Sequence, residues 1–241
     1  MNALYPYRHA TRLINAFQFT VGTANFRNLE GDFEAALLAC AIHRQALSIG
    51  SVRKVSINGI ATSFAQSTET LRRAGRALVE RGLCRTTPRG IEIQFDFFAN
   101  THIVRMRDDL EIAFLDLLRA YRRSGLRLPE NIEDRSRPAM IAAALDIQLS
   151  AQELSETRIS RPTRLHVLGT VAVLNAALLT EDPALGLRYG HDATVPPDDF
   201  RLPVSAQTVA RAIGLPRTTV RRHLDEAERG AQVRRVEGGE E

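Results

Sequence analysis

Two clusters of arginine dominate the residues that could carry chemistry. Arg72, Arg73 and Arg76 lie within five positions of one another, and Arg221 and Arg222 are adjacent near the other end of the chain. A guanidinium group binds phosphate or guanine through paired hydrogen bonds. Within a helix, each cluster would lie on one exposed face. The spacing therefore favours two surfaces that bind nucleic acid.

No other group of residues has the spacing of a reactive site. The six histidines show no metal-ligand spacing with cysteines or carboxylates, and the glycine-rich motifs that hold nucleotide phosphates are absent. The two cysteines, Cys40 and Cys84, are far apart and are expected to be buried thiols. We therefore expect no enzyme, no catalytic residue, no metal and no cofactor.

The charge is unevenly distributed along the chain. The formal net charge is +4, and Lys54 is the only lysine, so nearly all the positive charge is arginine. Residues 53–89 contain eight basic and two acidic residues, whereas residues 108–160 contain seven arginines and ten acidic residues. Because phosphate repels an acidic segment, the basic stretch is the better candidate for nucleic-acid contact.

Residues 203–236 have the pattern of a helix-turn-helix. Ser205 is a natural N-cap for a helix over Ala206–Ile213, and Gly214 suits a left-handed turn. A second helix is predicted over about 216–229. Its buried stripe is expected to contain Val220, Leu224 and Ala227, with the arginines on the opposite face.

The same pattern occurs about 149 residues earlier, which indicates an internal repeat. Here the second helix is predicted over about 67–81, with Glu69, Glu80 and the three arginines on its exposed face. The corresponding pairs are Ser56 and Ser205, Ala61 and Ala210, Ala65 and Gly214, Leu71 and Val220, and Arg72-Arg73 and Arg221-Arg222.

Two short alternating segments after residue 82 flank the tip Pro88-Arg89-Gly90, which predicts a β-hairpin. Two helices followed by a hairpin with a basic tip resemble the winged helix-turn-helix family of bacterial transcription regulators. The resemblance covers roughly residues 32–96 and 163–241. It implies that the second helix of each pair lies in the major groove. The implied DNA-binding residues are Thr68, Thr70, Arg72, Arg73, Arg76, Arg89, Arg217, Thr218, Arg221 and Arg222.

The intervening sequence predicts further helices. They are expected over Thr11–Phe19, over Asp32–Ser48 with Asp32 as the cap, over Asp108–Ser124, from Pro138 to about Thr157, and over Thr163–Leu179. Loops are expected around Gly22, Asn25 and Asn28 and over residues 181–203.

The expected fold is mainly α, with two winged helix-turn-helix domains with small β-hairpin wings, joined by a helical middle segment. Residues 1–107 would form an N-terminal winged-helix domain with an N-terminal arm, and residues 108–160 a linking and possible dimerisation segment. Residues 161–241 would form a C-terminal winged-helix-like domain. The second wing is incomplete: Val233–Val236 is the one candidate strand.

The expected function is sequence-specific binding of double-stranded DNA in transcription regulation, by a cytoplasmic, nucleoid-associated protein without membrane contact. The middle helices could form a homodimer, but the sequence does not fix the oligomeric state, and no pattern demands a small-molecule effector. Asp225, Glu226 and Glu228 make the second unit the weaker candidate reader. Two alternatives stay open: a plasmid-type replication initiator that binds origin repeats, and a winged-helix interaction scaffold that does not bind DNA.

Overall fold

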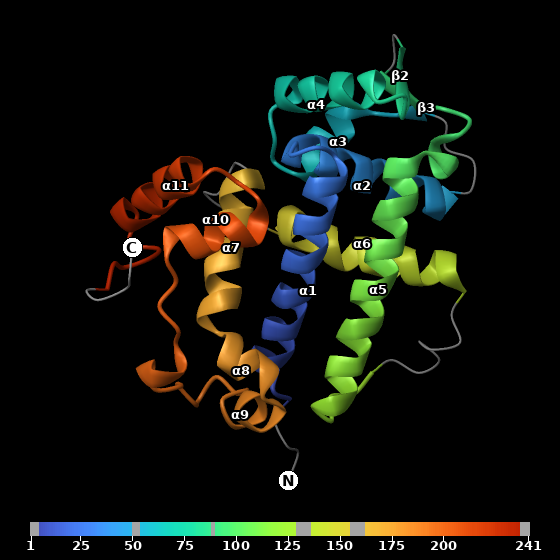
Figure 1. Cartoon of the computed structure of the whole chain (residues 1–241). Helices are drawn as coiled ribbons and strands as arrows, with labels where there is room; N and C mark the ends of the chain where they lie inside the picture. The colour runs from blue at the N-terminus through green and yellow to red at the C-terminus, as the bar shows by residue number, and fades with distance from the viewer. Residues whose placement is uncertain (1–4, 50–53, 88–89, 129–135, 155–161, 237–241) are drawn as a thin grey trace. The chain divides into compact units, whose positions relative to one another are not determined.

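A computed structural model describes the chain apart from residues 1–4, 50–53, 88–89, 129–135, 155–161 and 237–241. The described residues form eleven α-helices, two 3-10 helices and three short strands (Figure 1). The mainly α fold class expected from the sequence is confirmed. None of the described helices combines the length and the apolar character that crossing a membrane requires.

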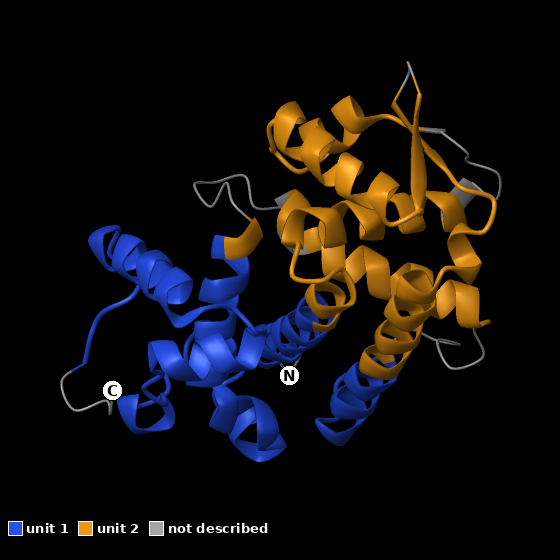
Figure 2. Ribbon diagram, turned by 45° about the horizontal axis from the view of Figure 1, so that its top comes forward, with its two compact units in different colours: residues 1–23, 115–130, 164–241 blue, residues 24–114, 131–163 orange. Residues whose placement is uncertain are grey.

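The chain forms two compact units, each assembled from separate stretches of sequence (Figure 2). Unit 1 comprises residues 1–23, 115–130 and 164–241, and unit 2 comprises residues 24–114 and 131–163. Residues 108–160, expected to form a separate helical middle, are divided between the two units.

Unit 2 contains the first pair of short helices and all the described strands. Its elements are α2 (Phe33–Ile49), β1 (Lys54–Val55), α3 (Ile57–Ser63), α4 (Thr68–Glu80), β2 (Cys84–Thr87), β3 (Gly90–Ile93), the 3-10 helix η1 (Phe97–Ala99) and α6 (Arg137–Leu154). Two long helices, α1 (Tyr7–Asn28) and α5 (Thr101–Arg123), contribute residues to both units.

Helix α2 is the centre of unit 2. The Asp32 carboxylate accepts a hydrogen bond from the Ala35 backbone N–H at 2.9 Å, so the predicted cap at the start of α2 is confirmed. Along the helix, Leu38 and Ile42 are fully buried, and α2 packs against both α4 and α6. Helix α4 therefore rests on a helix that is itself held in the core, and α3 packs on α4.

The three strands form an antiparallel sheet with the order β1-β3-β2. In β2 and β3, Cys84 pairs with Ile93 and Thr87 with Gly90, which confirms the predicted hairpin. The third strand, β1, pairs Val55 with Ile91 and was not predicted. A two-residue strand is too short to show an alternating pattern in the sequence.

Unit 1 contains the second helix pair. Its elements are mainly α7 (Pro162–Asn175), α8 (Ala177–Glu181), α9 (Pro183–Arg188), the 3-10 helix η2 (Asp198–Phe200), α10 (Ala206–Ile213) and α11 (Arg217–Arg229). A cluster of fully buried side chains joins Val167 of α7 to Val209, Ile213 and Val220 of the helix pair. This second pair is thus anchored on α7, as α4 of the first pair is anchored on α2.

The predicted loop after residue 19 is wrong, because α1 continues to Asn28. Gly22 is buried within α1, and the buried Asn25 side chain donates a hydrogen bond from Nδ2 to Cys40 Sγ at 3.2 Å. A tertiary partner therefore binds the amide nitrogen of a residue that local preference would place in a loop, while the buried Asn25 Oδ1 has no hydrogen-bond partner among the described residues.

The start of α5 was predicted seven residues too late. The helix begins at Thr101, where the Asn100 side-chain oxygen accepts a hydrogen bond from the His102 backbone N–H at 2.9 Å. Its first turns bury Ile103 and Met106. The acidic residues from Asp108 onward resembled a helix start, but they lie within the helix.

The end of the predicted helix over Thr163–Leu179 and the loop over residues 181–203 are also revised. The helix is interrupted at Ala176, between α7 and α8, and a further helix, α9, begins after Asp182. The Asp182 carboxylate caps α9 by accepting hydrogen bonds from the Ala184 and Leu185 N–H groups. A proline at the first position of a helix suits this geometry, although it resembles a loop signal in the sequence.

His43 makes the stability of unit 2 depend on pH. Its side chain is fully buried against the rings of Phe97 and Phe98, and burial, with a smaller effect from Arg107, lowers its pKa to about 4. An unfolded histidine has a pKa of about 6.5, so below that pH the unfolded chain takes up a proton that the folded chain refuses. We expect the free energy of unfolding to fall by about 2 kcal/mol through His43 between about pH 7 and about pH 5.

Urea unfolding of wild type and His43→Leu at the two pH values measures this effect. In the variant, the pH dependence of the free energy of unfolding should lose the contribution of His43. It should keep the contribution of His166, because burial also lowers the pKa of His166 to about 4. Equal losses of stability in the two proteins would contradict the prediction.

Candidate functional site

Both helices of the first pair begin with a serine cap. Ser56 Oγ accepts a hydrogen bond from the Gly59 N–H at the start of α3, at 3.2 Å. Ser67 Oγ accepts one from the Thr70 N–H at the start of α4, at 3.0 Å. These caps satisfy backbone donors that a helix leaves unpaired in its first turn. Helix α4 lies within the predicted 67–81 range.

The turn between α3 and α4 depends on a left-handed residue. Ala65 has a φ of 48°, and the Gln66 N–H donates a hydrogen bond back to the Ala61 carbonyl at 2.9 Å. In the second pair, Gly214 occupies the corresponding position with a φ of 78°. The predicted correspondence of the two turns is confirmed in backbone conformation, with alanine in place of glycine in the first.

Replacing Ala65 by glycine is expected to stabilise the protein. An L-residue pays a steric penalty in the left-handed region that glycine avoids, and part of the gain is offset by the greater freedom of glycine in the unfolded chain. We expect Ala65→Gly to raise the free energy of unfolding by about 0.5 to 1 kcal/mol in chemical denaturation. Gly214→Ala is the matched control and should lower it. Destabilisation by Ala65→Gly would show that the turn is not strained.

Helix α4 has the two faces that the sequence predicts. Its buried residues are Leu71, Ala74, Gly75 and Leu78. Its exposed residues are Glu69, Arg72, Arg73, Arg76 and Glu80. Burial of Leu71 and Leu78 holds the helix on the core, so the exposed face keeps a constant orientation relative to α2 and the sheet.

Gly75 allows α4 to approach the sheet. A Cβ atom at this position would lie 2.5 Å from Ile91 Cδ1 of β3. The sequence suggested only the usual loss of helix stability that a glycine causes. In the structure, the missing side chain is what allows α4 and β3 to pack closely.

The arginines of the exposed face differ in their partners. Within the part of the chain that the structure describes, Arg72 and Arg73 form no ion pair. Arg76 pairs with Glu69 at 3.3 Å, between two exposed side chains. Arg81 belongs to another environment, because it is largely buried and pairs with Glu30 at 3.2 Å. Two guanidinium groups are therefore available for an external anion.

The remaining predicted residues of this unit have different environments. Thr68 and Thr70 are partly exposed at the start of α4, and Thr70 Oγ1 shares a hydrogen bond of 2.7 Å with Ser67 Oγ. Arg89 lies outside the described residues. Sequence reasoning missed the exposed Arg85 of β2, which pairs with the buried Glu92 of β3 at 2.9 Å. The outward position of Arg85 in an alternating strand is the signal that could have found it.

The second helix pair shares the capped first helix and the left-handed turn, but α11 follows Pro216 without a side-chain cap. Ser205 Oγ caps α10 by accepting a hydrogen bond from the Thr208 N–H at 3.0 Å, and Gly214 makes the turn into α11. Helix α11 begins at Arg217, next to the predicted start. The predicted contact residues on its outer side are all exposed. They are Arg217, Thr218, Arg221 and Arg222.

The buried stripe of α11 differs in one member from the prediction. His223 is buried together with Val220 and Ala227, whereas Leu224 is only partly buried. The prediction followed hydrophobicity, but the packing direction of the helix decides which residue faces the core. His223 Nδ1 lies 3.8 Å from the Glu226 carboxylate.

The acidic residues of α11 are balanced by nearby arginines. Arg235 pairs with Asp225 at 3.3 Å and with Glu228 at 3.0 Å, and Arg164 lies 3.9 Å from Glu226. Residues 233–236 do not form the candidate strand. Instead, this segment supplies Arg235, whose single positive charge offsets part of the negative charge of Asp225 and Glu228. The negative charge that weakened the case for this helix is thus partly compensated.

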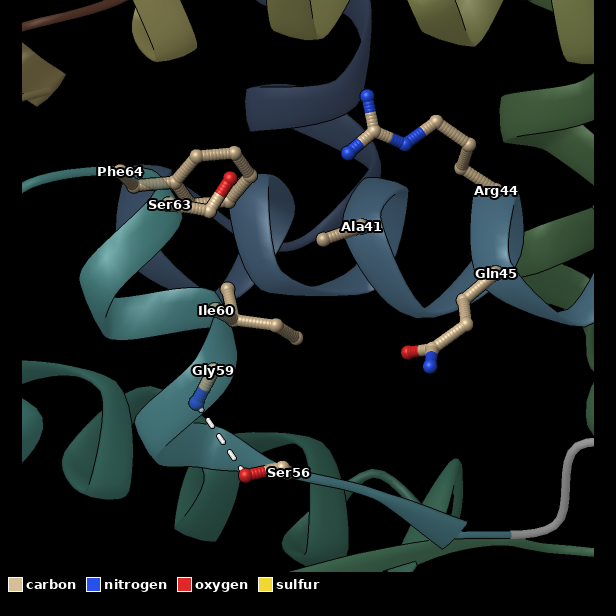
Figure 3. Close-up of a pocket in the computed structure, with 8 residues that line it drawn as sticks. All are labelled: Ala41, Arg44, Gln45, Ser56, Gly59, Ile60, Ser63 and Phe64. Carbon is tan, nitrogen blue, oxygen red and sulfur yellow. Dashed lines mark hydrogen bonds between the residues drawn. The ribbon is translucent and has the colours of Figure 1, made fainter.

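A pocket of about 310 Å³ lies between α2 and α3 (Figure 3). Its lining includes Arg44, Gln45 and Ser63. The Arg44 guanidinium is already bound by the Glu153 carboxylate of α6, which also accepts a hydrogen bond from Ser63 Oγ at 3.2 Å. The network ties α3 to α2 and α6, so it explains the fixed position of α3 without a ligand. Among the described residues, no group of three or more potential ligands could hold a metal.

Comparison of the chain with protein-family models, with curated proteins and with solved structures found no match. The functional argument therefore rests on the residues and geometry of the two helix pairs.

Proposed function

We propose that the chain binds specific sequences in double-stranded DNA as a transcription regulator, with α4 in the major groove. The observation that carries the proposal is the exposed face of α4, where Arg72 and Arg73 have no partner among the described residues. A cationic helix that follows a capped short helix and a tight turn has the form of a recognition helix. Phosphate contacts would supply affinity and base edges would supply specificity.

The hairpin supports a winged form of the motif. Strands β2 and β3 follow α4 directly and project from unit 2 (Figure 1). In the winged helix-turn-helix family such a hairpin touches the DNA backbone or the minor groove. Arg85 and Thr86 of β2 are exposed, whereas Thr87 is half-buried and donates a hydrogen bond from Oγ1 to the Gly90 carbonyl at 3.1 Å.

Helix α11 is the proposed second recognition helix. It follows a serine-capped helix and a left-handed turn, as α4 does, and it repeats the paired arginines of the first unit. Its acidic residues are engaged by Arg235 and Arg164. Two such helices in one chain match a DNA target with two half-sites. A target of direct repeats would instead favour a replication initiator.

A fluorescence-anisotropy titration with a labelled random duplex tests the proposal. From about 50 mM to about 200 mM salt, we expect the logarithm of the binding constant to fall linearly with the logarithm of salt concentration, by about 0.9 per phosphate contacted. Absence of binding at about 50 mM salt would overturn the proposal and favour an interaction scaffold, for which capture of a protein partner is the next measurement.

A further inference from the structure

Glu69 is an acidic residue on the proposed DNA-binding face. It is the second residue of α4 and lies on the same exposed side as Arg72 and Arg73. Its side chain is 70% exposed. Its one ion-pair partner among the described residues is Arg76, which lies on the same face about one helical turn beyond Arg72. In a helix-turn-helix, the N-terminal residues of the second helix contact base edges. Glu69 is therefore placed where sequence is read.

A purely structural role accounts poorly for this position. A carboxylate in the first turn is favoured by the helix dipole, but Ser67 already caps α4. The Glu69–Arg76 pair is exposed on both sides, so solvent and salt screen it. On a surface that must approach phosphate, a negative charge weakens binding to every sequence unless a base compensates for it.

The chemistry of a carboxylate limits which base can compensate. An ionised carboxylate only accepts hydrogen bonds, whereas phosphate oxygens and the O6 and N7 atoms of guanine are acceptors as well. The amino group at N4 of cytosine is the donor that glutamate prefers in the major groove. The neighbouring Arg72 and Arg73 suit guanine, so the three side chains together fit G·C pairs.

We infer that Glu69 determines part of the sequence specificity, by accepting a hydrogen bond from the N4 amino group of a cytosine in the major groove. The inference rests on the proposed function of α4.

Selection of binding sites from a randomised duplex pool, with wild type and Glu69→Gln in parallel, tests this inference. Glutamine prefers adenine, through its N6 and N7 atoms. We expect the two proteins to select sites that differ at one base pair, with cytosine for wild type replaced by adenine for the variant. Glu80→Gln is the matched control, because it removes the same charge from the exposed C-terminal end of α4. It should select the wild-type site.

Titrations with the selected and random duplexes give a second readout. For Glu69→Gln we expect the affinity for the site that the wild type selects, divided by the affinity for random duplex, to fall by about tenfold. If wild type binds DNA but Glu69→Gln keeps the same site and ratio, the inference about Glu69 alone is overturned. If wild type binds no duplex, the proposed function is overturned with it.

Discussion

Replacement of Arg72, Arg73 and Arg76 by alanine together is expected to lower the affinity for random duplex DNA by about a hundredfold at low salt. All three side chains are exposed on α4, so their removal leaves the buried stripe of Leu71 and Leu78 intact. Each lost phosphate contact should reduce the salt dependence by about 0.9, and the triple variant by about 2.7 at most. Anisotropy titration across a salt series measures both quantities.

A charge-matched control separates contact from net charge. Arg105, Arg123 and Arg127 are exposed residues outside both helix pairs. Their replacement by alanine removes the same formal charge, and we expect a loss of affinity of only a few fold. If the two triple variants lose affinity equally, DNA binding reflects overall charge, and α4 is not the recognition helix.

The replacement Gly90→Ala is expected to destabilise the protein by about 3 kcal/mol. Gly90 has a φ of 132°, a conformation that L-residues rarely adopt. An added Cβ would also lie 2.5 Å from the backbone oxygen of Val55 in the adjacent strand. Because β1 and β3 pair at this point, the clash is relieved only by separation of the strands. Urea denaturation measures the loss as a lower midpoint.

Gly59→Ala is the contrasting control for Gly90→Ala. Gly59 is an exposed residue of α3, and an added Cβ would make only ordinary contacts with Ser56, at 3.7 Å. Alanine favours a helix over glycine, so this variant should be neutral or up to about 1 kcal/mol more stable. A similar loss of stability in both variants would mean that the close approach of β3 to β1 is not the cause.

Local pattern was sufficient to predict the two helix pairs. Ser56 and Ser205 have the short side chains that cap helices, and Gly214 suits a left-handed turn. The regular spacing of apolar residues in α4 separates the buried from the exposed side at a period of 3.6 residues. These signals lie within one or two helical turns of the residues they govern, so the sequence alone is enough to detect them.

Several elements could not be predicted because their cause is distant in sequence. Asn25 of α1 donates a hydrogen bond to Cys40 of the next helix, and Gly75 of α4 lies against the end of the Ile91 side chain of the hairpin. In the same way, β1 exists only because β3 pairs with it. Local propensity weighs against such residues, and tertiary contacts outweigh it.

By itself, the sequence determined the mainly helical class, the repeated helix pairs and the faces on which their arginines lie. Only the tertiary structure decided which of those charges lack an ion-pair partner among the described residues. Arg72 and Arg73 have none, Arg81 pairs with Glu30, and Arg235 pairs with Asp225 and Glu228 of α11. The physical reason is that a residue's charge follows from its type, whereas its availability depends on partners that only the folded chain brings within a few ångströms.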